Sequence, residues 1–227
     1  MIIAVIGQKG GTGKTTVSVH LSGWRTLSDR EAILIDADRQ QTSLNWVDRR
    51  NELGFKAPLC VQQLGRSLKL AAVELSRKYS DVIVDVGAGD ELAFEAILRV
   101  ADFAVLPLQP NEFDIWSLSY LQNAALDALA LNDQLRVISV LNRAPPHYYG
   151  LDARAATDAL ARCEGIETSG LVVKERGSIR RATPTGRLIH EWRPRDGRAI
   201  EELGAVYRHV FGEPVPLDPG AVGSEAR

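Results

Sequence analysis

The sequence predicts an α/β fold with a single doubly wound, mostly parallel sheet and helices on both of its faces. Short apolar runs rich in β-branched residues alternate with longer segments whose apolar residues recur at helical spacing. The runs are nearly continuous in apolar residues, which is typical of strands that helices cover on both faces. The chain of 227 residues is long enough for one large domain of this class, and two ordinary domains would be cramped.

Five apolar runs are expected to form strands, and a sixth, shorter run is a candidate of the same kind. In chain order they are MIIAVIG (1–7), AILIDAD (32–38), DVIVDVG (81–87), DFAVLPL (102–108), RVISVLN (136–142) and GLVV (170–173). In such a sheet, ligands bind where strands end and helices begin. The residues that follow these runs are therefore the first candidates for a site.

Six segments between the strands carry apolar residues at helical spacing, and a last helix is expected over 198–211. The six segments are 14–29, 41–53, 66–79, 91–100, 114–131 and 151–163. The tail 212–227 is rich in Pro and Gly and has too few apolar residues to pack, so we expect it to be disordered. One domain over 1–211 is predicted, with no internal repeat.

The composition is typical of a soluble globular protein, with 45% hydrophobic and 25% charged residues. Cys60 and Cys163 lie far apart and outside any CxxC pattern, which favours reduced, structural thiols and no metal framework. The apolar start, 1–7, is too short for a secretory signal and lacks a basic leader. No apolar run approaches the length that spans a bilayer. We therefore expect a cytoplasmic location.

A glycine-rich segment, GGTGKTT (10–16), lies between the first expected strand and the first expected helix. This is the context of a phosphate-binding loop, in which glycines let successive N–H groups face an anion and the helix N-terminus adds a positive field. Gln8 stands where the standard spacing has glycine. We expect Lys14 to reach the β- and γ-phosphates, Thr15 to hold Mg²⁺ and Thr16 to bond the α-phosphate. The expected nucleotide-binding residues of the loop are Gly10, Gly11, Thr12, Gly13, Lys14, Thr15 and Thr16.

Carboxylates close two of the expected strands. Asp36 and Asp38 end the run ILIDAD, and Asp85 ends VIVD just before a flexible Gly-Ala-Gly. A carboxylate at the end of an apolar strand is typical of the Walker B element, which orders the water shell of Mg²⁺. A single Asp in this place is more often a turn residue. Three of them at the sheet edge that carries a phosphate loop favour a functional role.

The segments QKGGTGKTT (8–16), IDADRQ (35–40) and VIVDVGAG (82–89) together resemble the ParA/MinD family of deviant Walker ATPases. PLQPNEFD (107–114) and VLNR (140–143) lie where the later elements of the family lie, and the resemblance covers most of 1–211. It implies a P-loop NTPase fold, ATP and Mg²⁺ as cofactors, and hydrolysis of ATP to ADP and phosphate. With no helix-turn-helix extension before the first strand, the small partition-type ParA proteins are the branch that we expect.

The resemblance also implies a homodimer that forms when ATP is bound. Lys9 matches the signature lysine, which crosses to the ATP of the partner subunit and neutralises charge there much as an arginine finger does. Asp38 matches the aspartate that orients the attacking water, and Asp36 matches its partner near the metal. Asp85 matches the Walker B aspartate. The expected catalytic residues are Lys9, Lys14 and Asp38, and the expected metal-site residues are Thr15, Asp36 and Asp85.

Three further positions match residues of the family's nucleotide pocket. Gly87 would present a backbone N–H to the γ-phosphate, and Asn142 resembles the asparagine that reads the adenine edge. The segment that begins at Pro107 would form part of the base pocket. One position departs from the family pattern Asp-x-Asp-Pro-Gln, because Arg39 replaces the proline. The loop that carries Asp38 then loses a fixed φ angle, which affects the expected rate of hydrolysis more than nucleotide binding.

A basic stretch, 174–198, holds eight Lys or Arg residues against three acids, a net charge of +5 in a chain whose net charge is −2. Such a patch indicates a polyanion partner, bound through phosphates without sequence reading. The resemblance implies that this partner is non-specific nucleoid DNA, held by the ATP-bound dimer with added avidity. The alternative is a solvated face with internal ion pairs. The candidates for DNA contact are Arg176, Arg180, Arg181 and Arg187.

The main expectation is an ATPase that partitions plasmid or chromosomal DNA and is stimulated by a ParB-like or ParG-like centromere-binding adaptor. The alternative is a positioning ATPase that places a non-DNA cargo with the same core, and the sequence barely distinguishes the two. A MinD-like membrane ATPase needs an amphipathic C-terminal helix, and the tail from Gly212 has no apolar face, so no membrane partner is expected. A metallocluster relative such as the nitrogenase iron protein would need a cysteine near the dimer seam, where neither cysteine lies.

Overall fold

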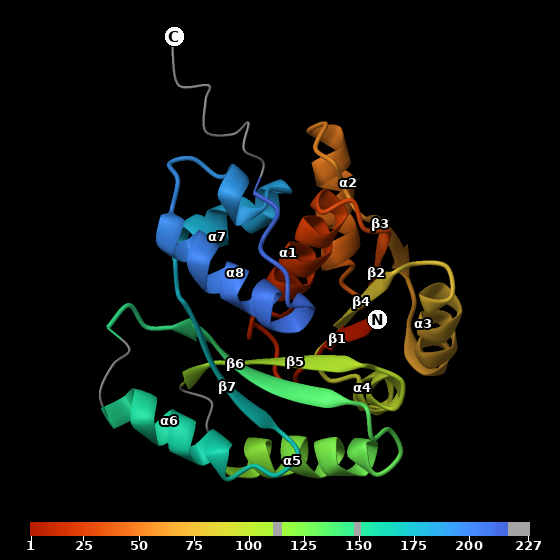
Figure 1. Cartoon of the computed structure of the whole chain (residues 1–227), viewed down its shortest axis with the longest axis vertical. Coiled ribbons are helices and arrows are strands. Elements are labelled where there is room, and N and C mark those ends of the chain that lie inside the picture. Colours follow the sequence, from red (N-terminus) through yellow and green to blue (C-terminus); the bar gives the residue numbers. More distant parts are fainter. Residues whose placement is uncertain (111–114, 148–150, 218–227) are drawn as a thin grey trace.

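The computed structural model describes residues 1–110, 115–147 and 151–217, and within them the chain forms a seven-stranded sheet (Figure 1). The strand order is β3-β2-β4-β1-β5-β6-β7, and each neighbouring pair is parallel. This confirms the predicted α/β fold. The strands are β1 (Ile2–Val5), β2 (Ala32–Ala37), β3 (Leu59–Gln62), β4 (Asp81–Val86), β5 (Phe103–Leu108), β6 (Arg136–Ala144) and β7 (Glu167–Lys174).

Helices cover both faces of the sheet (Figure 1). One face carries α1 (Lys14–Leu27), α2 (Thr42–Glu52), α7 (Gly177–Ala182) and α8 (Gly197–Phe211). The other carries α3 (Leu68–Ser76), α4 (Glu91–Leu98), α5 (Ile115–Leu129) and α6 (Leu151–Ala161). Short 3₁₀ turns lie at Gly65–Ser67, Thr183–Thr185 and Ile189–Glu191.

The two faces explain why the strand sequences are almost continuously apolar. In β1, Ile3 and Val5 belong to the core under α1 and α8, whereas Ile2 and Ala4 belong to the core under α3 to α6. Every residue of β1, β2, β4 and β5 is buried. A strand covered on both sides has no position for a solvated side chain, so the usual alternation of apolar and polar residues is lost.

Three elements differ from the sequence-based expectation. Strand β3 was not predicted, because this edge strand is short and its side chains are largely exposed, as at Leu59 (60% exposed). Strand β7 begins at Glu167, upstream of the predicted run, and pairs irregularly with β6. Helix α7 forms inside the basic stretch, where its six residues show too little periodicity to be recognised. Residues 111–114, of which only residue 114 belongs to the predicted helix 114–131, lie outside the described residues.

The expected disorder of the tail does not hold for its first residues. Glu213 accepts hydrogen bonds from Arg25 (2.6 Å) and Arg30 (3.2 Å), and Val215 packs against the core under α8. Residues 218–227, the rest of the predicted tail, lie outside the described residues. Among the described residues, no helix combines the length and apolar character needed to cross a bilayer.

Candidate nucleotide-binding site

The loop between β1 and α1 has the backbone shape that a phosphate cradle requires. Gly11 and Gly13 have φ angles of +80° and +96°, which glycine adopts without strain. A Cβ on Gly13 would lie 2.0 Å from the Asn142 amide nitrogen, so no other residue fits there. The same amide nitrogen donates to the Thr12 carbonyl at 2.6 Å. Asn142, predicted to read the adenine edge, therefore supports the loop at the end of β6.

The two lysines of the loop have different surroundings. Lys14 is buried (7% exposed), and its ammonium donates to the Lys9 carbonyl at 2.8 Å, so it lies folded into its own loop. The Lys9 side chain is exposed and makes no hydrogen bond or ion pair with any other described residue. Lys14 therefore has the position of the cation within the cradle, and the charge of Lys9 remains available at the surface.

Hydroxyl groups surround the carboxylate of Asp85 at the end of β4. Thr15 donates to Asp85 Oδ2 at 2.8 Å and Ser43 donates to the same oxygen at 2.7 Å, while Ser18 donates to Oδ1 at 3.1 Å. Because the Thr15 proton points to Asp85, the lone pairs of its oxygen are free to coordinate a cation. Such a hard oxygen ligand is what Mg²⁺ prefers.

Two buried carboxylates lie side by side at this edge, since Asp36 of β2 is paired in register with Asp85 of β4. Burial raises the pKa of Asp85 to about 6 against the effect of its hydroxyl donors, and the charge of Asp36 adds to the rise. Burial likewise raises the pKa of Asp36. A divalent cation nearby would favour the ionised form of both groups.

The loop after β2 carries Asp38 into the site. The two oxygens of Asp36 accept the N–H groups of Asp38 and Leu44, each at 2.9 Å, and thereby hold both ends of this loop. These bonds fix the loop where the family has a proline and this chain has Arg39. Asp36 thus has a positioning role that the sequence did not indicate, and its expected place near the metal remains a prediction.

Gly87 lies where the loops after β2 and β4 touch. A Cβ on Gly87 would lie 3.1 Å from the Ala37 carbonyl oxygen and 3.2 Å from Asp38 Cγ, so a larger residue would separate the two loops. The N–H of Gly87 donates to Ala37 O at 3.2 Å. Its predicted contact with the γ-phosphate would require that hydrogen bond to open.

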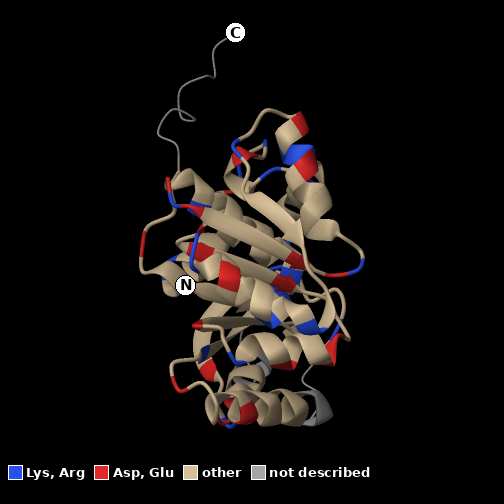
Figure 2. Ribbon diagram, turned by 90° about the vertical axis from the view of Figure 1, so that its right-hand side faces the viewer, with Lys and Arg blue, Asp and Glu red and all other residues tan. Residues whose placement is uncertain are grey.

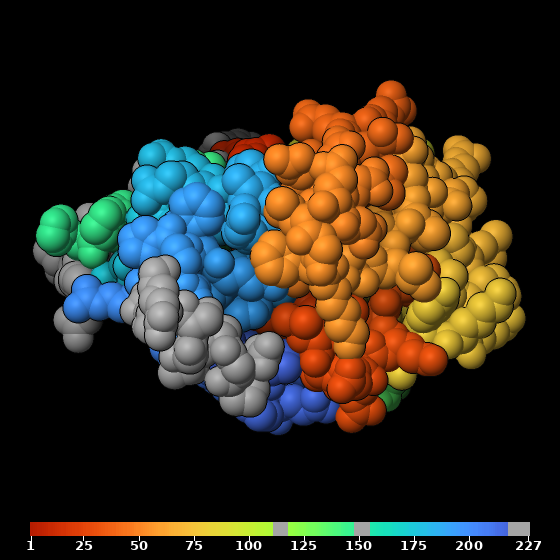
Figure 3. Space-filling model, turned by 90° about the horizontal axis from the view of Figure 1, so that it is seen from above, coloured from red at the N-terminus to blue at the C-terminus, as the bar shows by residue number. Residues whose placement is uncertain are grey.

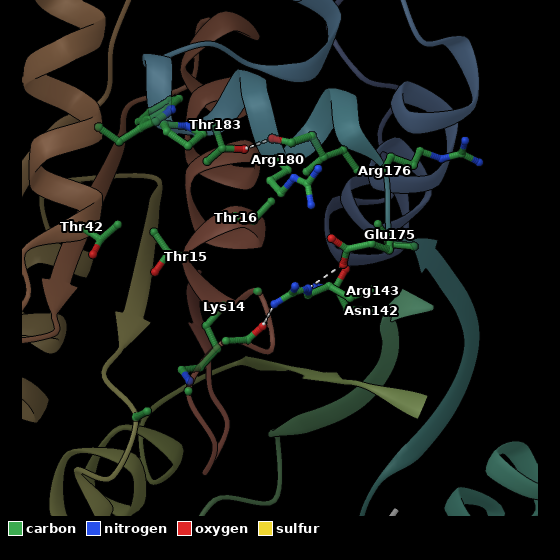
Figure 4. Close-up of a pocket in the computed structure, with 18 of the residues that line it drawn as sticks. Lys14, Thr15, Thr16, Thr42, Asn142, Arg143, Glu175, Arg176, Arg180 and Thr183 are labelled. Carbon is green, nitrogen blue, oxygen red and sulfur yellow. Dashed lines mark hydrogen bonds and ion pairs between the residues drawn. The ribbon is translucent and has the colours of Figure 1, made fainter. Parts of the chain in front are cut away.

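These elements enclose a pocket of about 660 Å³ (Figure 4). Its volume is in the range of small-molecule sites, and its walls come from the phosphate loop, the loop after β2, α2, the end of β6 and the segment from β7 into α7. Five cations face two carboxylates among the lining side chains. The cations are Lys14, Arg143, Lys174, Arg176 and Arg180, and the carboxylates are Asp38 and Glu175. This charge balance and the glycine cradle fit an Mg²⁺–nucleoside triphosphate.

Sequence reasoning missed residues that hold the loop from outside. Arg143 donates through Nη1 to the Gly11 carbonyl at 2.7 Å and through Nε to Glu175 at 2.7 Å (Figure 4). Gln109 also donates to the Gly11 carbonyl, at 2.9 Å. Arg143 has a φ angle of +53°, which is rare for a non-glycine residue and has no signature in the sequence. Pro107 is a buried residue of β5 and does not line the pocket, and 111–114 lie outside the described residues.

The four arginines predicted to contact DNA do not share one surface. Arg176 and Arg180 line the nucleotide pocket, whereas Arg181 lines a separate cavity and Arg187 lies over the Phe55 ring at 5.8 Å. Arg176 is paired with Glu202 (Nε–Oε2 2.8 Å). On the side of the molecule away from α7, which Figure 2 shows, acidic and basic residues are also interspersed. Internal ion pairs therefore account for part of the basic stretch.

Comparison with known proteins places this site in a family. Residues 3–213 match the family described as the CobQ/CobB/MinD/ParA nucleotide binding domain. Two curated relatives carry the name maintenance of carboxysome distribution protein A. The protein from Gloeobacter kilaueensis is 31% identical over 214 residues, covering 93% of each chain. The protein from Halothiobacillus neapolitanus is 27% identical over 214 residues, covering 92% of this chain and 95% of the relative.

Solved structures share the fold at lower identity. Cell-division ATPase MinD from Pyrococcus furiosus superposes with a TM-score of 0.69 at 18% identity, covering 92% of this chain and 97% of MinD. An ATP complex of McdA from Cyanothece superposes with a TM-score of 0.69 at 16% identity, covering 93% of this chain and 96% of McdA. A plasmid partition protein from Borrelia burgdorferi bound to AMPPNP superposes with a TM-score of 0.65 at 14% identity, covering 93% of this chain and 96% of that protein. The chain therefore belongs to the CobQ/CobB/MinD/ParA nucleotide-binding domain family and is an ATPase that works with ATP and Mg²⁺.

Proposed function

We propose that the protein is a ParA-type positioning ATPase that distributes a large non-DNA cargo within the cell. In this proposal ATP binding closes a homodimer that associates with nucleoid DNA, and a partner on the cargo stimulates hydrolysis and release. The observation that carries the choice of cargo is that both curated relatives are named for carboxysome distribution and align with more than nine-tenths of this chain. The cargo itself is proposed only as a large protein assembly of that general kind.

The geometry of the site supports the ATP switch in this proposal. Lys14 lies within the cradle, Thr15 is oriented by Asp85, and Asp38 reaches the pocket on a loop fixed by Asp36. These parts suit binding and hydrolysis within one chain. The exposed Lys9 is the remaining cation of the loop, and a second subunit would give it a phosphate to neutralise.

DNA partition is the second candidate. It is favoured by the basic stretch over 174–198 and by the shared fold with a plasmid partition protein. Both functions would use the same dimer and the same non-specific contact with DNA. They differ in what the adaptor is attached to, namely a protein assembly or a DNA centromere.

A deletion of the gene in its host tests the choice between the two. We expect fluorescently labelled protein assemblies to cluster when the gene is deleted, while plasmid and chromosome retention stay normal. The Lys14→Ala variant should reproduce the deletion, because removing the cradle cation abolishes nucleotide binding. Loss of a plasmid or chromosome with normally spaced assemblies would instead support DNA partition. Even spacing with the Lys14→Ala variant would contradict any role of the ATP switch.

A further inference from the structure

We propose that Arg180 binds the nucleotide in the pocket of its own subunit, at the α-phosphate, and does not serve as a DNA contact. The side chain comes from α7, which lies across the pocket from the phosphate loop. Figure 4 shows it directed into the pocket beside Thr16, the residue predicted to bond the α-phosphate. This inference rests on the nucleotide site and is independent of the cargo.

The charge of Arg180 is not neutralised within the described part of the protein. Two other arginines of the pocket are paired, Arg143 with Glu175 at 2.7 Å and Arg176 with Glu202 at 2.8 Å. Arg180 itself makes no side-chain hydrogen bond or ion pair with another described residue. A guanidinium directed into a pocket with an excess of cations is suited to an anionic ligand, and its planar fork matches two oxygens of a phosphate.

The backbone that carries Arg180 is firmly placed. The neighbouring Ile179 and Ala182 are buried in the core, the Arg180 N–H donates to Arg176 O at 3.1 Å, and the Thr183 hydroxyl donates to Ile179 O at 3.0 Å. Residues of an α-helix are rotated by about 100° from one to the next. Arg181 accordingly faces a different cavity, lined also by Ser178 and Asp196. Adjacent arginines on one helix therefore have different surroundings.

The position along the pocket indicates which part of the nucleotide Arg180 contacts. Asp38 lies beside Gly87 and Ala88 lies beside Gly10, at the end of the pocket expected to hold the γ-phosphate. Figure 4 shows Thr16 and Arg180 close to each other, on α1 and α7. The α-phosphate is common to ATP and ADP. Arg180 should therefore contribute equally to the binding of both nucleotides, unlike a residue that senses the γ-phosphate.

Calorimetric titration of the full-length protein with Mg²⁺–AMPPNP and with Mg²⁺–ADP tests this assignment. We expect Arg180→Ala to raise the Kd of both nucleotides about tenfold, as for a charge-assisted hydrogen bond at a partly exposed site. Arg180→Lys should recover part of the affinity, because it keeps the charge but loses the fork. Arg181→Ala is the matched control on the same helix, and it should bind both nucleotides as the wild type does.

Several outcomes would overturn the proposal. They are a wild-type Kd for Arg180→Ala, equal losses in Arg180→Ala and Arg181→Ala, or a loss confined to AMPPNP. A gel-shift assay at saturating AMPPNP and low salt provides a second readout, in which Arg180→Ala should retain DNA as the wild type does. Loss of DNA with unchanged nucleotide affinity would place Arg180 on the DNA surface instead. Thermal unfolding of each variant verifies that α7 remains folded, and Arg180→Lys keeps the test valid if the alanine variant unfolds.

Discussion

His20 lies one helical turn after Thr16, and its two ring nitrogens have opposite roles. Nδ1 lies 2.7 Å from the Thr16 carbonyl oxygen and must donate, and Nε2 accepts the N–H of Ile189 at 3.0 Å. The ring therefore requires its neutral form with the proton on Nδ1. Burial lowers the pKa of His20 to about 4, although the hydrogen bond to the Thr16 carbonyl raises it in part.

The low pKa of His20 predicts a loss of stability in mild acid. In the unfolded chain the imidazole takes up a proton near pH 6.5, whereas the folded protein resists protonation until about pH 4. The contribution of neutral His20 to the free energy of unfolding is complete above pH 6.5. It falls by about 3 kcal/mol as the pH approaches 4. The raised pKa of Asp85 has the opposite effect in part of this range, because it adds stability as the pH falls below about 6. The pH dependence of wild-type stability is therefore the sum of both effects.

Urea unfolding at several pH values between 4.5 and 7.5 isolates the contribution of His20 to the pH dependence of stability. The His20→Gln variant should be less stable throughout, but its free energy of unfolding should depend less on pH than that of the wild type. The control variant is His147→Gln, which removes an exposed imidazole in place of a buried one. Parallel profiles for His20→Gln and the wild type would show that His20 does not titrate in this range.

At the residue scale, the sequence predicted the chemistry of the site better than the supporting contacts. The glycines at 11 and 13 and the position of Lys14 follow from local motif rules, because a phosphate loop constrains neighbouring residues. Asn142 contacts the loop across 130 residues of sequence, and its packing against Gly13 has no local pattern. The supporting role of Arg143 likewise has no local sequence pattern. Its left-handed backbone is imposed by tertiary structure.

At the scale of elements, the segment from 183 to 192 is attached to α2 by one buried arginine. Arg50 is fully buried and forms two hydrogen bonds with the Glu191 carboxylate, at 2.6 and 2.7 Å. It also donates to the Gly186 carbonyl, and its guanidinium lies over the Trp46 ring. Burial raises the pKa of Glu191, but the hydrogen bonds and charge of Arg50 outweigh it and lower that pKa overall. Figure 3 shows this segment beside α2 at the surface.

Arg50→Ala should therefore destabilise the protein by about 3–5 kcal/mol, because it leaves the Glu191 charge buried without its partner. Arg49 is the adjacent control on α2. It forms an exposed pair with Glu52, so Arg49→Ala should cost less than about 1 kcal/mol. Chemical denaturation of both variants measures the difference. In the double variant Arg50→Ala/Glu191→Ala, removal of the unpaired carboxylate should recover part of the lost stability. Similar stabilities for Arg50→Ala and Arg49→Ala would show that Arg50 does not hold this segment to α2.

The elements that the sequence predicted share one property, which is strong local patterning. The central strands are long apolar runs, and α8 has a clear apolar face with an Asp196 side-chain cap. Strand β3 and helix α7 lack such patterns because long-range contacts define them. Strand β3 exists through its pairing with β2, and α7 through the burial of Ile179 and Ala182.

At the scale of the whole molecule, the phosphate loop presents Lys9 outward while Lys14 remains inside its own cradle. A dimer that faces its two pockets toward each other would place each Lys9 near the phosphates of the partner. This arrangement predicts that binding and dimerisation can be separated by mutation. Lys14→Ala should lose both nucleotide binding and dimerisation, whereas Lys9→Ala should lose only dimerisation.

Light scattering during size-exclusion chromatography with Mg²⁺–AMPPNP measures this separation. Lys9→Ala should bind the nucleotide with wild-type affinity yet elute as a monomer, and its turnover should fall by about a thousandfold, as for loss of an arginine finger. Lys78→Ala, which removes an exposed lysine after α3, should leave both dimer and turnover intact. Dimers and normal turnover in Lys9→Ala would mean that each subunit completes its own site, so that the outward position of Lys9 has no consequence for the reaction.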